Sequence, residues 1–194
     1  MSITRCLRFM PRPKTVSDED VLNAALEVLA REGADFTLTD VARVVGLSRP
    51  TLIQRFGDKK ELLRRMARQE VEATAAWLET LPVREGAEGL DEFLSDIVLG
   101  MGSGSGFSAR VAIAAFEAHD PVLRRSAERR YALVIDAISA RLPPGPERSE
   151  LAVHLHSVIA GATMHWVASP QTEDLGKFVL ARVRWIAARL VNTP

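Results

Sequence analysis

The sequence predicts an all-α protein of about nine helices, in which a small three-helix unit precedes a larger helical bundle. Apolar residues recur at three- and four-residue spacing along nearly the whole chain of 194 residues, which is the period of a half-buried helix. No segment shows the strict alternation of apolar and polar residues that marks a half-buried strand. Hydrophobic residues make up 47% of the chain, enough for a substantial core.

The first two helices are expected from their capping signals. Ser17 can cap a helix whose acidic first turn, residues 18–20, lies at the positive end of the helix dipole. Gly33 is suited to end this helix because glycine readily adopts a left-handed backbone. A second helix is expected to follow Thr37, since Asp40 three residues later completes a capping box.

Later helices are expected from the same kinds of signal. Ser48 caps a short third helix that stops before Gly57. Asp58 caps a fourth, with Glu61 at its third position and Pro82 after its end. Further helices are expected over 87–100, 107–118, 121–141, 147–168 and 172–191, with the GSGSG run at 102–106 as a flexible linker.

The chain is accordingly divided into three parts. Residues 1–16 form a basic tail without acids, which is either disordered or an arm that reaches a DNA minor groove. Residues 17–62 form the three-helix unit, and residues 63–194 form the larger body. Residues 1–70 carry a net charge of +3 in a chain that is neutral overall, from 13 basic and 10 acidic residues, which favours an anion-binding front end.

The turn Gly46-Leu47-Ser48 joins two short helices as a helix-turn-helix requires. On the third helix, Leu52 and Phe56 share one side and are expected to form a small core with Leu47, Val41 and Val44. The opposite side carries Pro50, Thr51 and Gln54, flanked by Arg49, Ile53 and Arg55. No acid lies between Asp40 and Asp58, so this face is suited to DNA.

The side chains of this face have separate expected roles in DNA binding. Glutamine can pair with adenine, and threonine or isoleucine methyl groups can touch the thymine methyl. Arginine, lysine, hydroxyl groups and free helix amides can hold phosphates. Residues expected to address bases are Gln54, Thr51 and Pro50; those expected near the phosphate backbone are Thr37, Thr39, Ser48, Arg49, Arg55 and Lys59.

The stretch AALEVLAREGADFTLTDVARVVGLSRPTLIQRFGDKKELL, within Val21 to Leu63, resembles the N-terminal DNA-binding region of TetR-type transcriptional regulators. The family pattern is a hydrophobic first helix, a Gly, a Thr and the string IA..AGVS..TLY..F..K..L. This chain departs from the pattern at Val45, where the family prefers Ala, and at Ile53, where the family usually has a Tyr that touches a phosphate. The matching residues are Gly33, Thr37, Val41, Ala42, Gly46, Leu47, Ser48, Thr51, Leu52, Phe56, Lys59 and Leu62.

The resemblance implies a homodimer that places a recognition helix of each subunit in a major groove of operator DNA. It also implies that the C-terminal body dimerises and binds a small-molecule effector, whose binding releases a repressor from its operator. The last two helices are the expected dimer surface. Val158 to Ala162 allow close helix approach, and Leu175, Val179, Val183, Ile186 and Leu190 form an apolar stripe.

The body offers candidate ligand-binding residues and no site that favours an enzyme. The glycines near residue 100 fit no phosphate-binding loop, and His154 and His156 lie about 200° apart on one helix, so they cannot share a metal. No catalytic residue, metal or cofactor is expected. Residues that are first of all core or packing material, and that can also line an effector pocket, are Trp77, Phe93, Phe116, His119, Met164 and His165.

Two other interpretations remain open, and the cell compartment follows from composition. The first alternative is a helical small-molecule-binding or interaction protein without specific DNA binding, which the zero net charge and Ile53 favour. The second is an enzyme in the body, for which no nucleophile, metal or cofactor spacing was found. A single cysteine, Cys6, fits a reducing cytoplasm, and neither a secretory signal nor a membrane span is expected.

Overall fold

The computed structural model describes residues 16–100, 104–170 and 172–190, and all regular secondary structure in these ranges is helical. The expected all-α class is therefore confirmed. The basic tail, residues 1–15, lies outside the described residues. The elements in chain order are α1 (Asp18–Glu32), the 3-10 turn η1 (Gly33–Asp35), α2 (Leu38–Val45), α3 (Arg49–Phe56), α4 (Lys59–Thr80), α5 (Ala87–Gly100), α6 (Gly104–His119), α7 (Pro121–Ser139), α8 (Arg148–Val167) and α9 (Leu175–Leu190).

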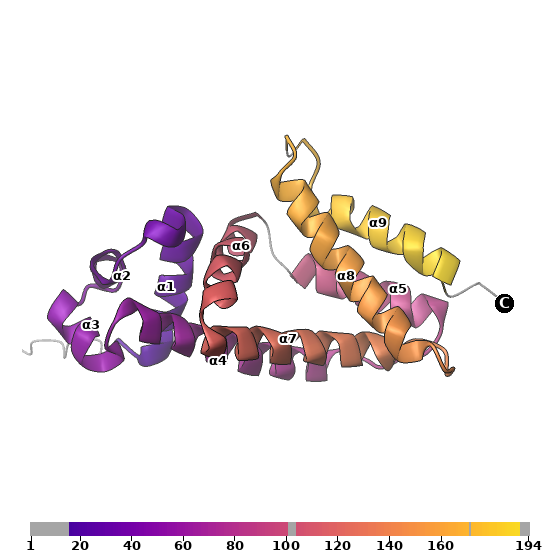
Figure 1. Cartoon of the computed structure of the whole chain (residues 1–194), viewed down its shortest axis with the longest axis horizontal. Coiled ribbons are helices and arrows are strands. Elements are labelled where there is room, and N and C mark those ends of the chain that lie inside the picture. Colours follow the sequence, from indigo (N-terminus) through magenta and orange to yellow (C-terminus); the bar gives the residue numbers. More distant parts are fainter. Residues whose placement is uncertain (1–15, 101–103, 171, 191–194) are drawn as a thin grey trace, which may run out of the picture.

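Two long helices connect the ends of an elongated molecule. Figure 1 shows α1, α2 and α3 gathered at one end, with α4 and α7 running side by side away from them. Helices α5, α8 and α9 form the other end, and α6 stands between the two groups, packed on α1. Through α4 the first group is continuous with the second.

The N-terminal helices begin where the sequence predicted. Hydroxyl oxygens of Ser17, Thr37 and Ser48 accept hydrogen bonds from the amide three residues on, at 3.0, 3.3 and 3.2 Å. The Asp58 carboxylate does the same for the Glu61 amide at 2.8 Å. These caps satisfy amides that have no partner within the helix. Local sequence therefore determines this end of the fold.

Three boundaries in the larger body differ from the prediction. Helix α6 begins at Gly104, so residues 104–106 of the GSGSG run are helical and the expected linker is wrong there; residues 101–103 lie outside the described residues. Packing of α6 on α1 offsets the low helix propensity of glycine. Helix α7 ends at Ser139 and α9 begins at Leu175, after Asp174 accepts a hydrogen bond from the Lys177 amide.

The first hydrophobic core joins the N-terminal helices to parts of the body. It contains buried side chains of α1, α2 and α3, of the first two turns of α4, and also Ile113 of α6 and Leu123 of α7. Leu52 and Phe56 are buried here as predicted. Val44 is not, because its side chain is 45% exposed on the outer side of α2. The helical spacing alone did not show that α2 has so narrow a buried face.

The second core lies among α5, the end of α7, α8 and α9. Leu175, Val179 and Val183 of the predicted apolar stripe are buried in it. These three residues therefore pack against the chain's own helices, and their assignment to the dimer surface is wrong. A helix at a chain end shows the same apolar period whether a neighbouring helix or a second subunit covers it.

A buried arginine holds the C-terminal ends of α4 and α7 together. The Arg141 guanidinium donates to the carbonyls of Pro82 at 2.6 Å, Leu81 at 3.2 Å and Ala137 at 2.8 Å. It also stacks 3.6 Å from the ring centroid of Phe93. We call this contact the C-terminal clamp. Because Arg141 is only 2% exposed, its loss leaves carbonyl acceptors without a donor.

We expect Arg141→Met to lower the free energy of unfolding by about 2–4 kcal/mol, because methionine fills the space without donating hydrogen bonds. Urea unfolding followed by circular dichroism measures the change. Arg125→Met, at an exposed position of α7, is the matched control and should stay within about 0.5 kcal/mol of the parent. Equal effects of the two substitutions would contradict the role of the clamp.

Candidate nucleic-acid interface and ligand cavity

The turn between α2 and α3 has the geometry of a helix-turn-helix. Gly46 takes the left-handed backbone conformation, with φ 68° and ψ 27°, which L side chains rarely adopt. The Leu47 amide donates to the Ala42 carbonyl at 3.0 Å, and the half-buried Leu47 side chain packs against the first core. The turn therefore fixes α3 against α2.

The outer face of α3 is exposed to solvent. Arg49, Pro50, Ile53 and Gln54 are all exposed, and the Ile53 side chain is 41% accessible. Among the residues that the structure describes, none forms a hydrogen bond or ion pair with the side chain of Arg49 or Gln54. Their polar groups are therefore available to an external partner.

Two of the three predicted hydroxyl residues, Thr37 and Ser48, have a capping role as well. The Thr37 hydroxyl donates to the Asp40 carboxylate at 2.7 Å, within the capping box of α2. Ser48 caps α3, and its oxygen lies 2.8 Å from the Thr51 hydroxyl. Thr39 is exposed in the first turn of α2. These groups lie at helix N-termini, where backbone amides also favour a phosphate.

Two predicted phosphate ligands, which are half-buried, already have partners within the protein. Arg55 forms an ion pair with Asp18 and donates to the Val16 carbonyl at 3.0 Å. Lys59 donates to the Ala34 carbonyl at 2.6 Å. Its ammonium lies 4.3 Å from the centroid of a buried phenylalanine ring, Phe36, and burial lowers the pKa of Lys59. Their partners are 25 or more residues away, so local spacing did not reveal them.

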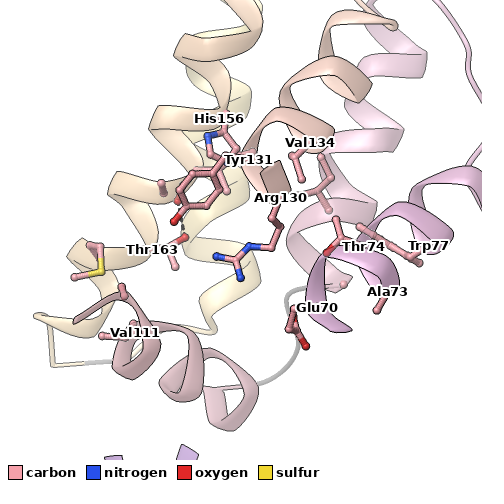
Figure 2. Close-up of a pocket in the computed structure, with 16 residues that line it drawn as sticks. Glu70, Ala73, Thr74, Trp77, Val111, Arg130, Tyr131, Val134, His156 and Thr163 are labelled. Atoms are coloured by element: carbon pink, nitrogen blue, oxygen red, sulfur yellow. Dashed lines mark hydrogen bonds between the residues drawn. The ribbon is translucent and has the colours of Figure 1, made fainter. Parts of the chain in front are cut away.

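A cavity of about 370 Å³ lies within the larger body. Figure 2 shows side chains from α4, α7 and α8 converging on it, with Val111 of α6 at one side. Residues 97 and 100 of α5 complete its wall. The lining residues are Glu70, Ala73, Thr74, Trp77, Ile97, Gly100, Val111, Ala114, Arg130, Tyr131, Val134, His156, Ile159, Ala160, Thr163 and Met164.

The structure brings two of the six predicted ligand residues, Trp77 and Met164, to this cavity. Phe93 lies in the second core beneath Arg141, and the Phe116 side chain packs against the first core near Lys59. His119 and His165 are exposed, and the His165 ring meets Phe178 edge-on. Aromatic content alone therefore did not separate core from cavity.

Gly100, at the end of α5, has a packing role. A Cβ atom at Gly100 would lie 2.8 Å from the Trp77 ring. The absence of a side chain lets this ring pack against the end of α5. The glycine therefore helps to position one aromatic wall of the cavity.

The polar side of the cavity comes from residues that sequence analysis did not select. Arg130 lies 3.5 Å from the Glu117 carboxylate, and both side chains are about nine-tenths buried. Burial raises the pKa of Glu117. Tyr131 and His156 place their ring centroids 5.0 Å apart, and burial, followed by the charge of Arg130, lowers the pKa of His156. Only the packing of α6, α7 and α8 brings these side chains together.

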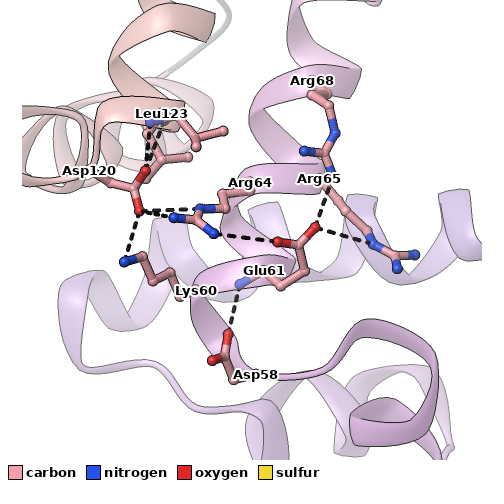
Figure 3. Close-up of polar contacts among 9 residues, drawn as sticks. Asp58, Lys60, Glu61, Arg64, Arg65, Arg68, Asp120 and Leu123 are labelled. Carbon is pink, nitrogen blue, oxygen red and sulfur yellow. Dashed lines mark hydrogen bonds and ion pairs between the residues drawn. The ribbon is translucent and has the colours of Figure 1, made fainter.

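A second clamp lies where α7 begins. Figure 3 shows the Asp120 carboxylate between α4 and the start of α7. It accepts from the Val122 amide at 2.8 Å and from Arg64 at 3.0 Å, and it pairs with Lys60 at 3.3 Å. Although burial acts in the opposite direction, these hydrogen bonds hold the pKa of Asp120 far below its usual range. We call this contact the N-terminal clamp.

The two clamps show that α4 and α7 run parallel. One joins the beginnings of the helices and the other joins their ends. The cavity wall formed by Thr74 and Trp77 of α4 and by Val134 of α7 lies between them. The helix that starts beside α3 thus also lines the cavity.

The described residues contain no group of three or more His, Cys, Asp or Glu side chains that could hold a metal ion. No helix in these ranges is both long enough and apolar enough to cross a membrane.

Comparisons with known proteins identify similar architectures. Residues 21–66 match the family of bacterial regulatory proteins described as the tetR family. A transcriptional regulator from Rhodococcus sp. Rha1 has a TM-score of 0.77 at 20% identity, over 90% of this chain and 95% of its own. No curated protein is similar enough to count as a match.

Several of the similar structures contain small-molecule ligands, imidazole and stearoyl-CoA among them. The multidrug binding protein EbrR, complexed with ethidium, has a TM-score of 0.70 at 19% identity, over 91% of this chain and 99% of its own. A transcriptional regulator from Saccharomonospora viridis, in complex with choline, has a TM-score of 0.68 at 18% identity, over 92% of this chain and 96% of its own. The resemblance to TetR-type regulators and the architecture predicted from it are therefore confirmed.

We expect Asp120→Asn to lower the unfolding temperature at pH 7. Below about pH 4, the unfolding temperature of this variant should fall less steeply with decreasing pH than that of the unchanged protein. A carboxyl whose pKa is depressed by folding stabilises the native state above its unfolded pKa, and this contribution is lost as acid protonates it. Asparagine still accepts hydrogen bonds from the α7 amides and removes only the charge. Thermal unfolding between pH 2 and 7 measures this, with the exposed Asp136→Asn as control; identical pH profiles for both variants would contradict the prediction.

Proposed function

We propose that this chain, whose residues 21–66 form a helix-turn-helix domain of the tetR family of bacterial regulatory proteins, is a repressor that leaves its operator when a small molecule binds. The observation that carries the proposal is the free outer face of α3, where Arg49 and Gln54 have no partner among the described residues. Side chains of this kind on a helix-turn-helix are those that contact base edges and phosphates.

Each side chain of this face takes a specific role in the proposal. Gln54 and Pro50 approach base edges, together with Thr51 at the flank. Arg49 and the hydroxyl groups of Thr37, Thr39 and Ser48 hold the phosphate backbone, together with the free amides that begin α4. Arg55 and Lys59 support the DNA-binding face indirectly, because their contacts with Asp18 and the Ala34 carbonyl hold α3 and α4 in place.

The proposed division of labour follows the predicted domains. Residues 17–62 bind DNA, and residues 63–194 bind the effector and dimerise. The cavity is the proposed effector site, which is supported by its volume and its mostly apolar lining. Two proteins of similar architecture were solved with ethidium and with choline bound. The class of ligand that this chain takes depends on its own lining residues.

The proposed dimer uses the outward faces of α8 and α9. Val153 and Gly161 are exposed along one side of α8, and the Trp185 side chain of α9 is 56% exposed. Small residues permit close helix approach, and an exposed tryptophan is typical of interface centres. This face replaces the stripe that the second core buries.

We expect Arg49→Ala to weaken binding to all DNA sequences and to reduce the salt dependence by about one phosphate contact. Gln54→Ala should instead relax the preference at one base pair, by about 1–3 kcal/mol. Fluorescence anisotropy at two salt concentrations, with operators selected from random DNA, measures both effects, and Arg129→Ala on exposed α7 surface is the control.

The DNA experiment also decides between the two candidate functions. A helical small-molecule-binding protein without DNA contact is favoured by Ile53, which replaces the tyrosine usual in the family. If the unchanged protein binds no DNA at low salt, the regulator proposal fails. Equal, sequence-independent losses for the two variants would contradict the roles assigned to Arg49 and Gln54.

We expect Trp185→Glu to convert a dimer into a monomer of unchanged helicity, because a charge at the centre of an apolar interface cannot be paired. Sedimentation velocity and circular dichroism measure the two properties. Val83→Glu changes another exposed apolar side chain, 65% accessible between α4 and α5, and should leave the dimer intact. A monomeric unchanged protein, or an unaffected dimer in Trp185→Glu, would contradict the proposed interface.

A further inference from the structure

Arg130 brings more hydrogen-bond donors to the cavity than the protein uses. A guanidinium carries five N–H groups, and among the described residues its hydrogen-bond partner is Glu117, at the long distance of 3.5 Å. Figure 2 shows this guanidinium reaching into the space beside Thr163. Because the side chain is only 11% exposed, bulk water has little access to the remaining donors.

Two neighbouring side chains add donors at the same side. The Tyr131 hydroxyl and the His156 ring have no hydrogen-bond partner among the described residues. The pKa of His156 is lowered, so at pH 7 the ring is neutral and offers one N–H donor. The Thr163 hydroxyl hydrogen is already used, because it donates to the Ile159 carbonyl. Apart from the long contact with Glu117, the donors of Arg130, Tyr131 and His156 therefore have no acceptor among the described residues.

The rest of the lining is apolar and limits the ligand's size. Trp77, Ile97 and Val134 contribute an aromatic and aliphatic wall. A volume of about 370 Å³ is at the lower end of the range for sites that bind drug-sized ligands. A compact ring with a short side arm fits these properties.

We propose that the cavity binds a small aromatic monocarboxylate, with its carboxylate held by Arg130, Tyr131 and His156 and its ring against the Trp77 side. That this ligand acts as an effector rests on the proposed function, whereas its chemical class is inferred from the cavity alone. Arginine and carboxylate form charge-assisted hydrogen bonds, which are the strong ones in a poorly hydrated site.

A cationic ligand fits this chain less well, despite the cations bound by two similar structures. The Glu117 carboxylate already faces Arg130, and Glu70 also has an interaction of its own. A ligand cation would approach the Arg130 guanidinium without a free carboxylate to neutralise it. Like charges in a buried site repel strongly.

Three probes of nearly equal shape test the charge preference. Isothermal titration calorimetry of the full chain at pH 7 would compare 3-phenylpropionate, its carboxamide and 3-phenylpropylamine. We expect the carboxylate to bind about tenfold or more tightly than the amide, and the amine to bind most weakly. If the amide or the amine binds as tightly as the acid, or if no probe binds, the inference is overturned.

Matched variants locate the preference at Arg130. Arg130→Gln should remove most of the difference between acid and amide, whereas Arg129→Gln, one residue away and exposed, should preserve it. The double variant Glu117→Gln with Arg130→Gln avoids an unpaired buried carboxylate and should behave like Arg130→Gln. Circular dichroism verifies folding of each variant, and an unchanged preference in both folded Arg130 variants would overturn the assignment.

DNA binding separates this inference from the proposed function. A chain that binds its operator but none of the probes is a regulator with a different ligand, so the inference alone fails. A chain that prefers the carboxylate but binds no DNA at low salt retains the cavity chemistry and loses the regulator role. Release of operator DNA by 3-phenylpropionate, with loss of that release in Arg130→Gln, would support both.

Discussion

A buried carboxylate, Asp120, fixes the start of the helix pair that connects the two ends of this molecule. Asp120 caps the start of α7, where its carboxylate accepts a hydrogen bond from the Val122 amide. Through its ion pairs with Arg64 and Lys60, it also holds α7 to the first turns of α4. Neither arginine nor carboxylate is well placed in a protein interior alone, and each neutralises the other. The position of α3 relative to the body depends on this contact, because α4 follows α3 after only a two-residue turn.

The parallel pair α4 and α7 gives the fold its functional geometry. At one end, α4 begins with free amides beside the exposed face of α3. Further along, the last turns of α4 supply Trp77 to the cavity and the middle of α7 supplies Arg130. With 22 residues, α4 is about 33 Å long. A change at the cavity and a change at the end next to α3 therefore affect one continuous, hydrogen-bonded helix.

Sequence reasoning succeeded where the determining interactions are local. Ser17, Thr37 and Ser48 cap helices through atoms three residues away, so short patterns contain the information. It failed where partners are distant. Arg55 meets Asp18, and the apolar stripe of α9 meets α5 and α8 instead of a second subunit. The cavity was least predictable, since five helices supply its lining and Arg130 and Tyr131 of α7 meet His156 only when α8 packs on α7.

The two clamps have an evolutionary consequence. Inserting or deleting one residue in α4 between Arg64 and Leu81 would rotate the rest of the helix by about 100° and shift it by about 1.5 Å, which breaks one clamp. Replacing a side chain such as Thr74 alters neither. Natural variation in relatives of this chain should therefore preserve the lengths of these helices while it exchanges the cavity lining, so that ligand choice can diverge within an inherited frame.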